Sequence, residues 1–136
     1  VAAGGSVLPL SKENMDKKLN SIKQDGKTVF KNAVFNMADA SERVMKKNNL
    51  THDGISWLVP HQANKRIIEA VGRRMNLDAS KVMVNIQRYG NTTSATLPLL
   101  LADYESQLKK GDKLIFTAFG GGFSWGSIYF KWGYNS

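Results

Sequence analysis

The sequence predicts a layered α/β fold, and three observations support this prediction. Segments with the periodicity of an amphipathic helix alternate with short apolar segments typical of buried strands. Strands joined through a helix lie parallel in such folds, because the crossover returns the chain to the same end of the sheet. The last two strands are separated only by a glycine-rich turn, which indicates an antiparallel pair. We therefore expect helices layered on a mixed, mostly parallel sheet.

Local patterns predict the elements of the first half of the chain. Residues 1–27 are polar and rich in Lys, Asn, Ser and Gly, which predicts a loop. Thr28 is typical of a helix N-cap, and a helix of about 20 residues should follow it. The apolar stripe of this helix consists of Phe30, Ala33, Val34, Met37, Val44 and Met45. A strand is predicted over 55–59 and a second helix over roughly 63–76.

The remaining elements complete the predicted sheet. Residues 82–84 have the composition of a short strand. A third helix should end at 109–112. Its apolar face consists of Leu97, Leu100, Leu101, Tyr104 and Leu108. Strands are expected over 114–119 and 125–132, which gives the order α-β-α-β-α-β-β. The chain of 136 residues is long enough to form one domain with its own core.

Composition narrows the class of protein. No apolar run is long enough to span a bilayer, and the first ten residues lack the features of a signal peptide, so a cytoplasmic location without membrane attachment is expected. The chain begins with Val rather than Met, so we expect that it begins inside a larger polypeptide. It has no cysteine, which excludes a cysteine nucleophile or a zinc–thiolate site within these residues. The net charge of +8 favours an acidic or polyanionic partner.

Polar or glycine features follow three of the predicted strands. His61 follows the first of them, Asn91 the second and Gly120–Gly122 the third. Ligands of such sheets bind outside the carboxyl ends of the strands, so we expect these features to meet at one edge. The His and Asn side chains could both donate N–H groups to one oxyanion, and the glycines could present backbone N–H groups to a second. This pattern suits acyl-transfer or enolate chemistry.

Each feature also has a structural interpretation. A histidine at a strand end is more often structural, Asn91 could be a turn residue or a helix cap, and the glycine run could be a plain turn. A metal site is a poor alternative, because the other histidine, His52, lies in a polar turn and no carboxylate shares a ligand spacing with His61. The sequence gives little support for a Ser-His-Asp triad either, since no GxSxG motif is present. We predict no metal and no bound organic cofactor.

Three motifs carry a resemblance to a known family: WLVPHQANKRII, GNTTSAT and FGGGFSWGS. In this order they resemble the C-terminal half of β-ketoacyl-[acyl-carrier-protein] synthase III, a condensing enzyme of the thiolase fold that starts type II fatty acid synthesis. GKTVFKNAV and NNL look like the same family, so the resemblance covers the chain from about residue 26. It implies that 28–136 is the C-terminal thiolase-like domain, one of two similar α/β halves. After Asn91 the chain has Thr92-Thr93-Ser94, where TSA is usual.

The resemblance also implies roles for individual residues. His61 and Asn91 match the family's catalytic His and Asn, which hold the thioester carbonyl of malonyl-carrier protein while it loses CO2. Gly121 would donate a backbone N–H to the oxyanion hole of the acyl transfer, and Phe119 would lie beside the pocket. The nucleophilic cysteine belongs to the family's N-terminal half, so this cysteine-free chain is expected to be inactive alone.

Basic residues supply a candidate docking surface for the acidic carrier protein. The positions that match the family's carrier-binding residues are Lys31, Arg66, Arg73 and Arg74. The structural alternative is a solvated helix face on which Glu69 pairs with Arg73.

The resemblance implies acyl-CoA as a substrate, and acyl carrier protein and the N-terminal half of the enzyme as partners. It also implies that the complete protein is a homodimer. Two alternatives stay open. One is a thiolase-fold relative of secondary metabolism. The other is a non-catalytic basic binding module, although no nucleic-acid motif is present and we expect no nucleic-acid partner.

Overall fold

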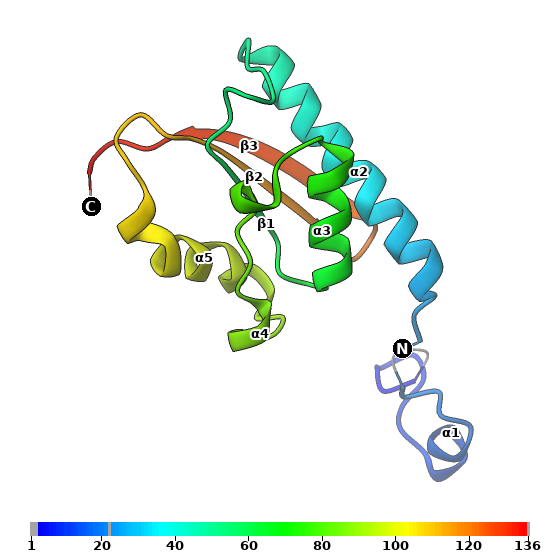
Figure 1. Cartoon of the computed structure of the whole chain (residues 1–136). Helices are drawn as coiled ribbons and strands as arrows, with labels where there is room; N and C mark the ends of the chain where they lie inside the picture. Colours follow the sequence, from blue (N-terminus) through cyan, green and yellow to red (C-terminus); the bar gives the residue numbers. More distant parts are fainter. Residues whose placement is uncertain (1–2, 22, 136) are drawn as a thin grey trace.

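The computed structural model describes residues 3–21 and 23–135, and its centre is a three-stranded sheet (Figure 1). The strands are β1 (Trp57–Pro60), β2 (Lys113–Gly120) and β3 (Ser124–Lys131), in the order β1-β2-β3. β1 pairs with β2 in parallel, and β2 pairs with β3 in the antiparallel direction. The predicted mixed sheet and its antiparallel C-terminal pair are therefore confirmed.

Helices cover both faces of this sheet. α2 (Gly26–Lys47) and α3 (Lys65–Arg74) pack on one face, and α5 (Thr96–Tyr104) packs on the other (Figure 1). Successive side chains of a strand point to opposite faces. In β1, Leu58 joins the core under α2 and α3, whereas Val59 joins the core under α5. Because both faces are covered, the strand is continuously apolar rather than alternating.

α2 begins three residues before its predicted start. Asp25 is the N-cap, and its carboxylate accepts the backbone N–H groups of Lys27 and Thr28. The prediction that Thr28 caps the helix was wrong, because Thr28 lies inside the first turn. Hydrogen bonds from the hydroxyl and the backbone N–H of Thr28 lower the pKa of Asp25.

α3 is the second predicted helix, and Asn64 is its N-cap. The Asn64 side-chain oxygen accepts the N–H of Arg66 at 2.9 Å. Near the C-terminal end, Gly72 allows α3 to pack closely on the chain that follows it. A Cβ at this position would lie 2.8 Å from a methyl group of Val82, so a larger residue would push the helix away.

The predicted strand over 82–84 was wrong. Val82 forms a single parallel bridge with Leu58, and the Met83 N–H donates to the Leu58 carbonyl at 3.0 Å. The Val84 N–H donates to the Tyr104 hydroxyl, and those of Asn85 and Ile86 donate to a glutamine side chain, so none of the three pairs with a strand. Val82 and Met83 are buried and Val84 is partly buried, so the apolar pattern of this segment indicated burial rather than pairing in a sheet.

The third predicted helix is α5, which is shorter than predicted. α4 (Ile86–Tyr89) precedes it, and α5 ends at Tyr104, so Leu108 lies outside the helix although it packs in the same core as Leu100. Pro98 lies in the first turn of α5, where no intrahelical N–H bond is needed. The 3-10 helices of the described chain are Ala79–Lys81, Thr93–Ala95 and Glu105–Gln107.

The segment before α2 contains a short helix where a loop was predicted. α1 (Lys12–Asp16) is capped by Ser11, whose hydroxyl accepts the Asn14 N–H at 3.1 Å. None of its residues is buried, so it has no apolar stripe that the sequence could reveal. In Figure 1 this segment extends beyond the N-terminal end of α2. The predicted loop also includes positions 1, 2 and 22, which lie outside the described residues.

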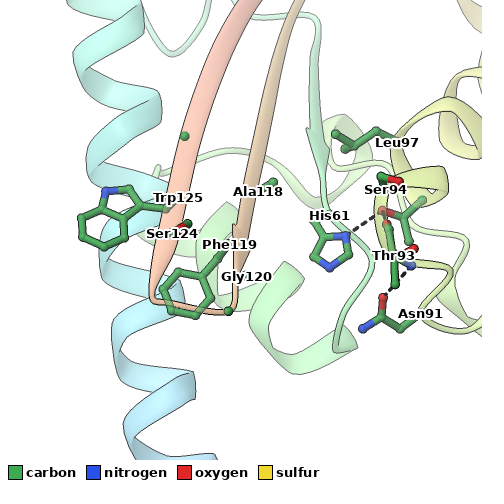
Figure 2. Close-up of a pocket in the computed structure, with 13 residues that line it drawn as sticks. His61, Asn91, Thr93, Ser94, Leu97, Ala118, Phe119, Gly120, Ser124 and Trp125 are labelled. Atoms are coloured by element: carbon green, nitrogen blue, oxygen red, sulfur yellow. Dashed lines mark hydrogen bonds between the residues drawn. The ribbon is translucent and has the colours of Figure 1, made fainter. Parts of the chain in front are cut away.

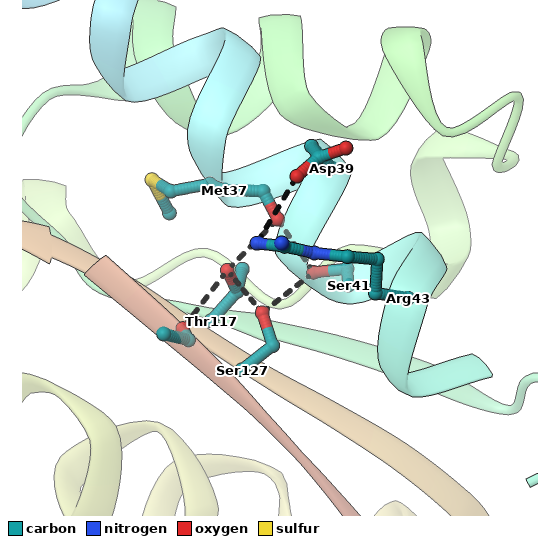
Figure 3. Close-up of polar contacts among 7 residues, drawn as sticks. Met37, Asp39, Ser41, Arg43, Thr117 and Ser127 are labelled. Atoms are coloured by element: carbon teal, nitrogen blue, oxygen red, sulfur yellow. Dashed lines mark hydrogen bonds and ion pairs between the residues drawn. The ribbon is translucent and has the colours of Figure 1, made fainter. Parts of the chain in front are cut away.

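Three hydroxyl groups join α2 to the sheet (Figure 3). Ser41 Oγ lies 3.0 Å from Ser127 Oγ on β3, and the Ser127 hydroxyl donates to Thr117 Oγ1 on β2 at 2.9 Å. Ser41 and Thr117 also donate to the Met37 carbonyl, at 2.8 and 3.2 Å. Both residues are almost fully buried, so their hydroxyls would be costly to bury without these partners. This hydroxyl ring therefore determines where α2 crosses β2 and β3.

Replacing Thr117 with Val should lower the free energy of unfolding by about 1–3 kcal/mol, because Val keeps the volume but removes hydrogen bonds to Ser127 and Met37. Thr92→Val is a matched control, since the Thr92 hydroxyl is buried and has no partner among the described residues. Urea unfolding of the protein that carries this chain would measure both changes. A Thr117→Val protein as stable as the wild type would contradict the role of the hydroxyl ring.

Candidate functional site

A cavity of about 590 Å³ opens at the carboxyl ends of β1 and β2 (Figure 2). The features that the sequence placed at this edge do meet here, because His61, Asn91, Phe119 and Gly121 all line the cavity. No Asp, Glu, Lys or Arg belongs to the lining among the described residues. A negative charge that develops in the cavity would therefore meet neutral hydrogen-bond donors.

The sheet places His61. The His61 N–H donates to the Thr117 carbonyl at 2.8 Å, which continues the parallel ladder one residue beyond Pro60. Backbone pairing thus fixes the histidine at the edge of the sheet. Its half-buried ring is turned toward the segment that leads into α5 (Figure 2).

Asn91 reaches the same cavity from the loop after α4. Gly90 ends that helix with a φ of 66°, a left-handed conformation that favours glycine. The Asn91 side-chain oxygen accepts the Thr93 N–H at 3.0 Å, so its NH2 group is left to donate. Thr93 itself has a φ of 53°, which is unusual for a β-branched residue. Hydrogen bonds on both its N–H and its carbonyl hold this conformation.

Gln62 joins the two loops, and sequence reasoning missed it. Its side chain is fully buried, and its Nε2 donates to a carbonyl of β1 at 2.8 Å. Its Oε1 accepts the N–H groups of Asn85 and Ile86, at 3.0 and 3.1 Å, at the start of α4. The position of the loop that carries Asn91 therefore depends on the residue next to His61. In the sequence, this glutamine cannot be distinguished from the polar residues that ordinarily precede a helix.

The ring of His61 has a hydroxyl partner that the sequence did not predict. Thr96 Oγ1 lies 2.7 Å from His61 Nδ1 and 2.9 Å from the Thr93 carbonyl oxygen. Burial lowers the pKa of His61 below its ordinary value of 6.5, so the ring is neutral at pH 7. A neutral imidazole has a single N–H, so its position decides what the ring can donate.

The glycine-rich turn forms another wall of the cavity. Gly122 has a φ of 133°, and a Cβ there would lie 2.9 Å from Ser124 Oγ, so this position requires glycine. Gly121 lines the cavity and has open space around its Cα. The Phe119 ring centroid lies 5.0 Å from that of Phe123 and 6.5 Å from that of Trp125. Phe119 and Trp125 line the cavity, so this side of it is apolar.

The predicted docking residues are exposed on α2 and α3: Lys31, Arg66, Arg73 and Arg74. Two of them are held by aromatic rings of α2. The Arg66 guanidinium lies 5.6 Å from the ring centroid of Phe30, and that of Arg74 lies 4.9 Å from the centroid of Phe35. These cation–π contacts keep both charges at the junction of the two helices.

A groove of about 580 Å³ borders both this basic surface and the cavity. Arg66 and Asn91 both line it, and Asn91 lines the cavity as well. Glu69 pairs with Lys65 at 3.9 Å, so the Glu69–Arg73 pair of the structural interpretation is not found in the described chain.

Neither a metal-binding cluster nor a membrane-spanning helix is found in the part of the chain that the structure describes. Among residues 3–21 and 23–135, no group of three or more His, Asp or Glu side chains could hold a metal ion. His52 is exposed in the turn before β1 and does not line the cavity of His61. No helix within the described ranges is long and apolar enough to cross a membrane.

The sequence is similar to those of known proteins. Residues 45–132 match the family described as 3-Oxoacyl-[acyl-carrier-protein (ACP)] synthase III C terminal. The chain belongs to this family. It is 59% identical over 133 residues to Beta-ketoacyl-[acyl-carrier-protein] synthase III 2 of Bacteroides thetaiotaomicron, and 59% identical over 133 residues to Beta-ketoacyl-[acyl-carrier-protein] synthase III of Phocaeicola vulgatus. Each alignment covers 98% of this chain and 40% of the relative, so the chain spans about two-fifths of their length.

Solved structures share the fold of this synthase III domain. The 3-oxoacyl-(acyl carrier protein) synthase III of Pseudomonas aeruginosa PAO1 has a TM-score of 0.80 at 37% identity, covering 91% of this chain and 39% of that chain. The priming β-ketosynthase of the R1128 polyketide pathway has a TM-score of 0.78 at 26% identity, covering 90% and 40%. The predicted fold class, one half of a thiolase-like fold, is confirmed.

His61 should titrate below pH 6.5, because burial disfavours its charged form. As the pH falls, the unfolded chain then binds its proton first, so the free energy of unfolding drops as the pH passes 6.5 and becomes constant below the folded pKa. An NMR titration would give the folded pKa. Urea unfolding of the wild type and His61→Gln, between about pH 7 and about pH 5, would test the linkage. The same pH dependence in both proteins would contradict it.

Proposed function

We propose that this domain supplies the decarboxylating part of the active site of a condensing enzyme. The enzyme would join malonyl-acyl carrier protein to a short acyl group derived from acyl-CoA and give 3-oxoacyl-carrier protein, the first step of type II fatty acid synthesis. The observation that carries this proposal is the convergence of His61 and Asn91 on one uncharged cavity beside the Gly120–Gly122 turn. The family to which the chain belongs, and its 59% identity to relatives named synthase III, support it.

The first chemical step would be the loss of CO2 from the malonyl thioester. The bond to the carboxylate breaks, and the electron pair left on carbon spreads onto the thioester oxygen as an enolate. Asn91 has a free NH2 group for this oxygen, because its own oxygen is occupied by Thr93. His61 would donate its single ring N–H to the same oxygen. Two neutral donors fixed in position before the reaction stabilise such a charge without further reorganisation.

The second step would be the attack of the enolate carbon on an acyl group held as a cysteine thioester. This chain has no cysteine, so the nucleophile would come from the part of the longer relatives that the chain does not cover. The attack turns the acyl carbonyl oxygen into an oxyanion, to which Gly121 would donate its backbone N–H. Collapse of this intermediate expels the cysteine thiolate and leaves the product on the carrier protein. Neither step requires a metal ion or an organic cofactor.

The carrier protein would dock on the basic surface formed by α2 and α3. The four exposed cations, held partly by Phe30 and Phe35, suit an acidic partner. The groove shared by Arg66 and Asn91 would then guide the thioester arm of the carrier from the docking surface into the cavity. In the complete enzyme, the domain would pack against the other half of its own chain and form a homodimer. The domain alone would be inactive in condensation.

A condensing enzyme of secondary metabolism is the second candidate. It is favoured by the TM-score of 0.78 with a polyketide priming β-ketosynthase, although identity to that protein is 26%. The two candidates share the decarboxylation chemistry and differ in the acyl group that primes the enzyme. Primer competition assays on the complete protein would distinguish them.

Removing either donor should slow malonyl decarboxylation by about 10²–10³-fold, the usual cost of losing one oxyanion donor. His61→Ala and Asn91→Ala in the complete protein are the direct variants. Acylation of the cysteine should be largely unchanged, because neither side chain takes part in that step. Radiolabelled CO2 release and mass spectrometry of the acyl-enzyme would measure the two steps. Loss of acylation with intact decarboxylation would show that the assigned roles are wrong.

Reversing the charge of Arg66 should weaken carrier-protein binding by roughly tenfold, which corresponds to about 1.4 kcal/mol. Arg66→Glu would be compared with Lys110→Glu, an exposed control before β2, at the end of the sheet opposite the cavity. Binding would be measured by surface plasmon resonance, and acyl transfer from a carrier-free thioester would be assayed in parallel. Docking on this surface predicts that Arg66→Glu impairs carrier binding alone. Equal losses in both assays would argue against it.

A further inference from the structure

A chain of hydrogen bonds through two threonines joins Asn91 to His61 (Figure 2). The Thr93 N–H donates to Asn91 Oδ1 at 3.0 Å, and the carbonyl of the same residue lies 2.9 Å from Thr96 Oγ1. Thr96 Oγ1 in turn lies 2.7 Å from His61 Nδ1. Thr96 is 1% exposed, so bulk water cannot replace these partners. The hydroxyl of Thr96 is therefore placed to influence the ring of His61.

A threonine hydroxyl has one proton and can give it to one of these two neighbours at a time. If it donates to the Thr93 carbonyl, then Nδ1 must carry the ring proton to bond Thr96, and Nε2 becomes an acceptor. If it donates to Nδ1, the proton of the neutral ring lies on Nε2. The Thr93 carbonyl also accepts the backbone N–H of Thr96, so it keeps a donor when the hydroxyl turns to the ring.

We propose that Thr96 is a positioning residue for His61: its hydroxyl donates to Nδ1 and so keeps the proton of the neutral ring on Nε2, the nitrogen turned away from Thr96. This arrangement satisfies Nδ1 and the Thr93 carbonyl together. It also gives the cavity a second neutral donor beside the Asn91 NH2 group. The opposite arrangement would present a lone pair to the enolate oxygen and repel it.

Burial favours the neutral ring, so the tautomer of His61 decides which ring nitrogen can donate a hydrogen bond. A charged imidazolium could donate from both nitrogens, but burial lowers the pKa of His61 and no anionic residue lines the cavity in the described chain to favour the cation. The catalytic consequence rests on the proposed function. The choice between the two arrangements rests on it as well, whereas the dependence of the tautomer on Thr96 rests on the hydrogen bonds of Thr96 alone.

The direct test is 15N NMR of the complete protein with labelled histidine rings. Three proteins would be compared: the wild type, Thr96→Val and Thr96→Ser. Val keeps the shape of threonine without the hydroxyl, and Ser restores the hydroxyl. We expect His61 to carry its proton on Nε2 in the wild type and in Thr96→Ser. In Thr96→Val the population should shift toward the Nδ1-protonated ring. His61→Ala would assign the signals.

Activity gives a second measurement on the same proteins. The kcat of malonyl decarboxylation should fall about tenfold or more in Thr96→Val, but less than the 10²–10³-fold expected for losing a whole donor. Thr96→Ser should restore the rate, and cysteine acylation should be unchanged in all variants. Thr92→Val, in the same loop and with a hydroxyl that has no partner in the described chain, should behave as the wild type.

The tautomer of the His61 ring decides whether the proposal holds. A wild-type ring protonated on Nδ1, or a Thr96→Val ring with the wild-type tautomer, would overturn the proposal. If Thr96→Val does not fold, the tautomer of the wild-type ring still tests the proposal. A tautomer that depends on Thr96 in a protein without decarboxylase activity would support this inference and overturn the proposed function instead.

Discussion

The parallel pairing of β1 with β2 is the constraint on which the rest of the structure depends. Its register places Pro60 opposite Thr117, and the ladder continues through the His61 N–H to the Thr117 carbonyl. The two carboxyl ends therefore stop at one edge, where β2 turns through the glycines into β3. Alternate residues of β1 face α2 and α3 on one side and α5 on the other, so both helical layers are positioned by the same strands.

Buried polar side chains link the sheet to the residues that line the cavity. Gln62 connects the end of β1 to the start of α4, and Thr96 connects α5 to the ring of His61. Both are buried, where a polar group without a partner is costly. Satisfied buried hydrogen bonds of this kind hold side chains in one geometry and so prepare donors before a substrate binds. The hydroxyl ring of Ser41, Thr117 and Ser127 does the same for the position of α2.

Charge is distributed unevenly over the domain. The cavity is lined by neutral residues, whereas the cations at the junction of α2 and α3 are exposed and lie on aromatic rings. Exposed charges act mainly on the rate and the specificity of association, while neutral donors in a partly buried cavity act on charge that develops during a reaction. This separation is the one that the proposed function requires, with docking at the surface and chemistry inside the cavity. The groove between Arg66 and Asn91 joins the two regions.

The sequence by itself determined the main elements, the antiparallel C-terminal pair and the meeting of His61, Asn91 and the glycines at one edge. These follow from local periodicity and from the rule for strand ends, which need no knowledge of distant contacts. Tertiary structure decided the rest. Val82 and Met83 are buried without forming a strand, because the N–H groups of residues 84–86 bond the side chains of Tyr104 and Gln62. The contact between His61 and Thr96 spans 35 residues and exists only once the sheet register and α5 are in place. Local patterns encode which residues are buried, whereas partners that are distant in sequence are set by how the layers pack.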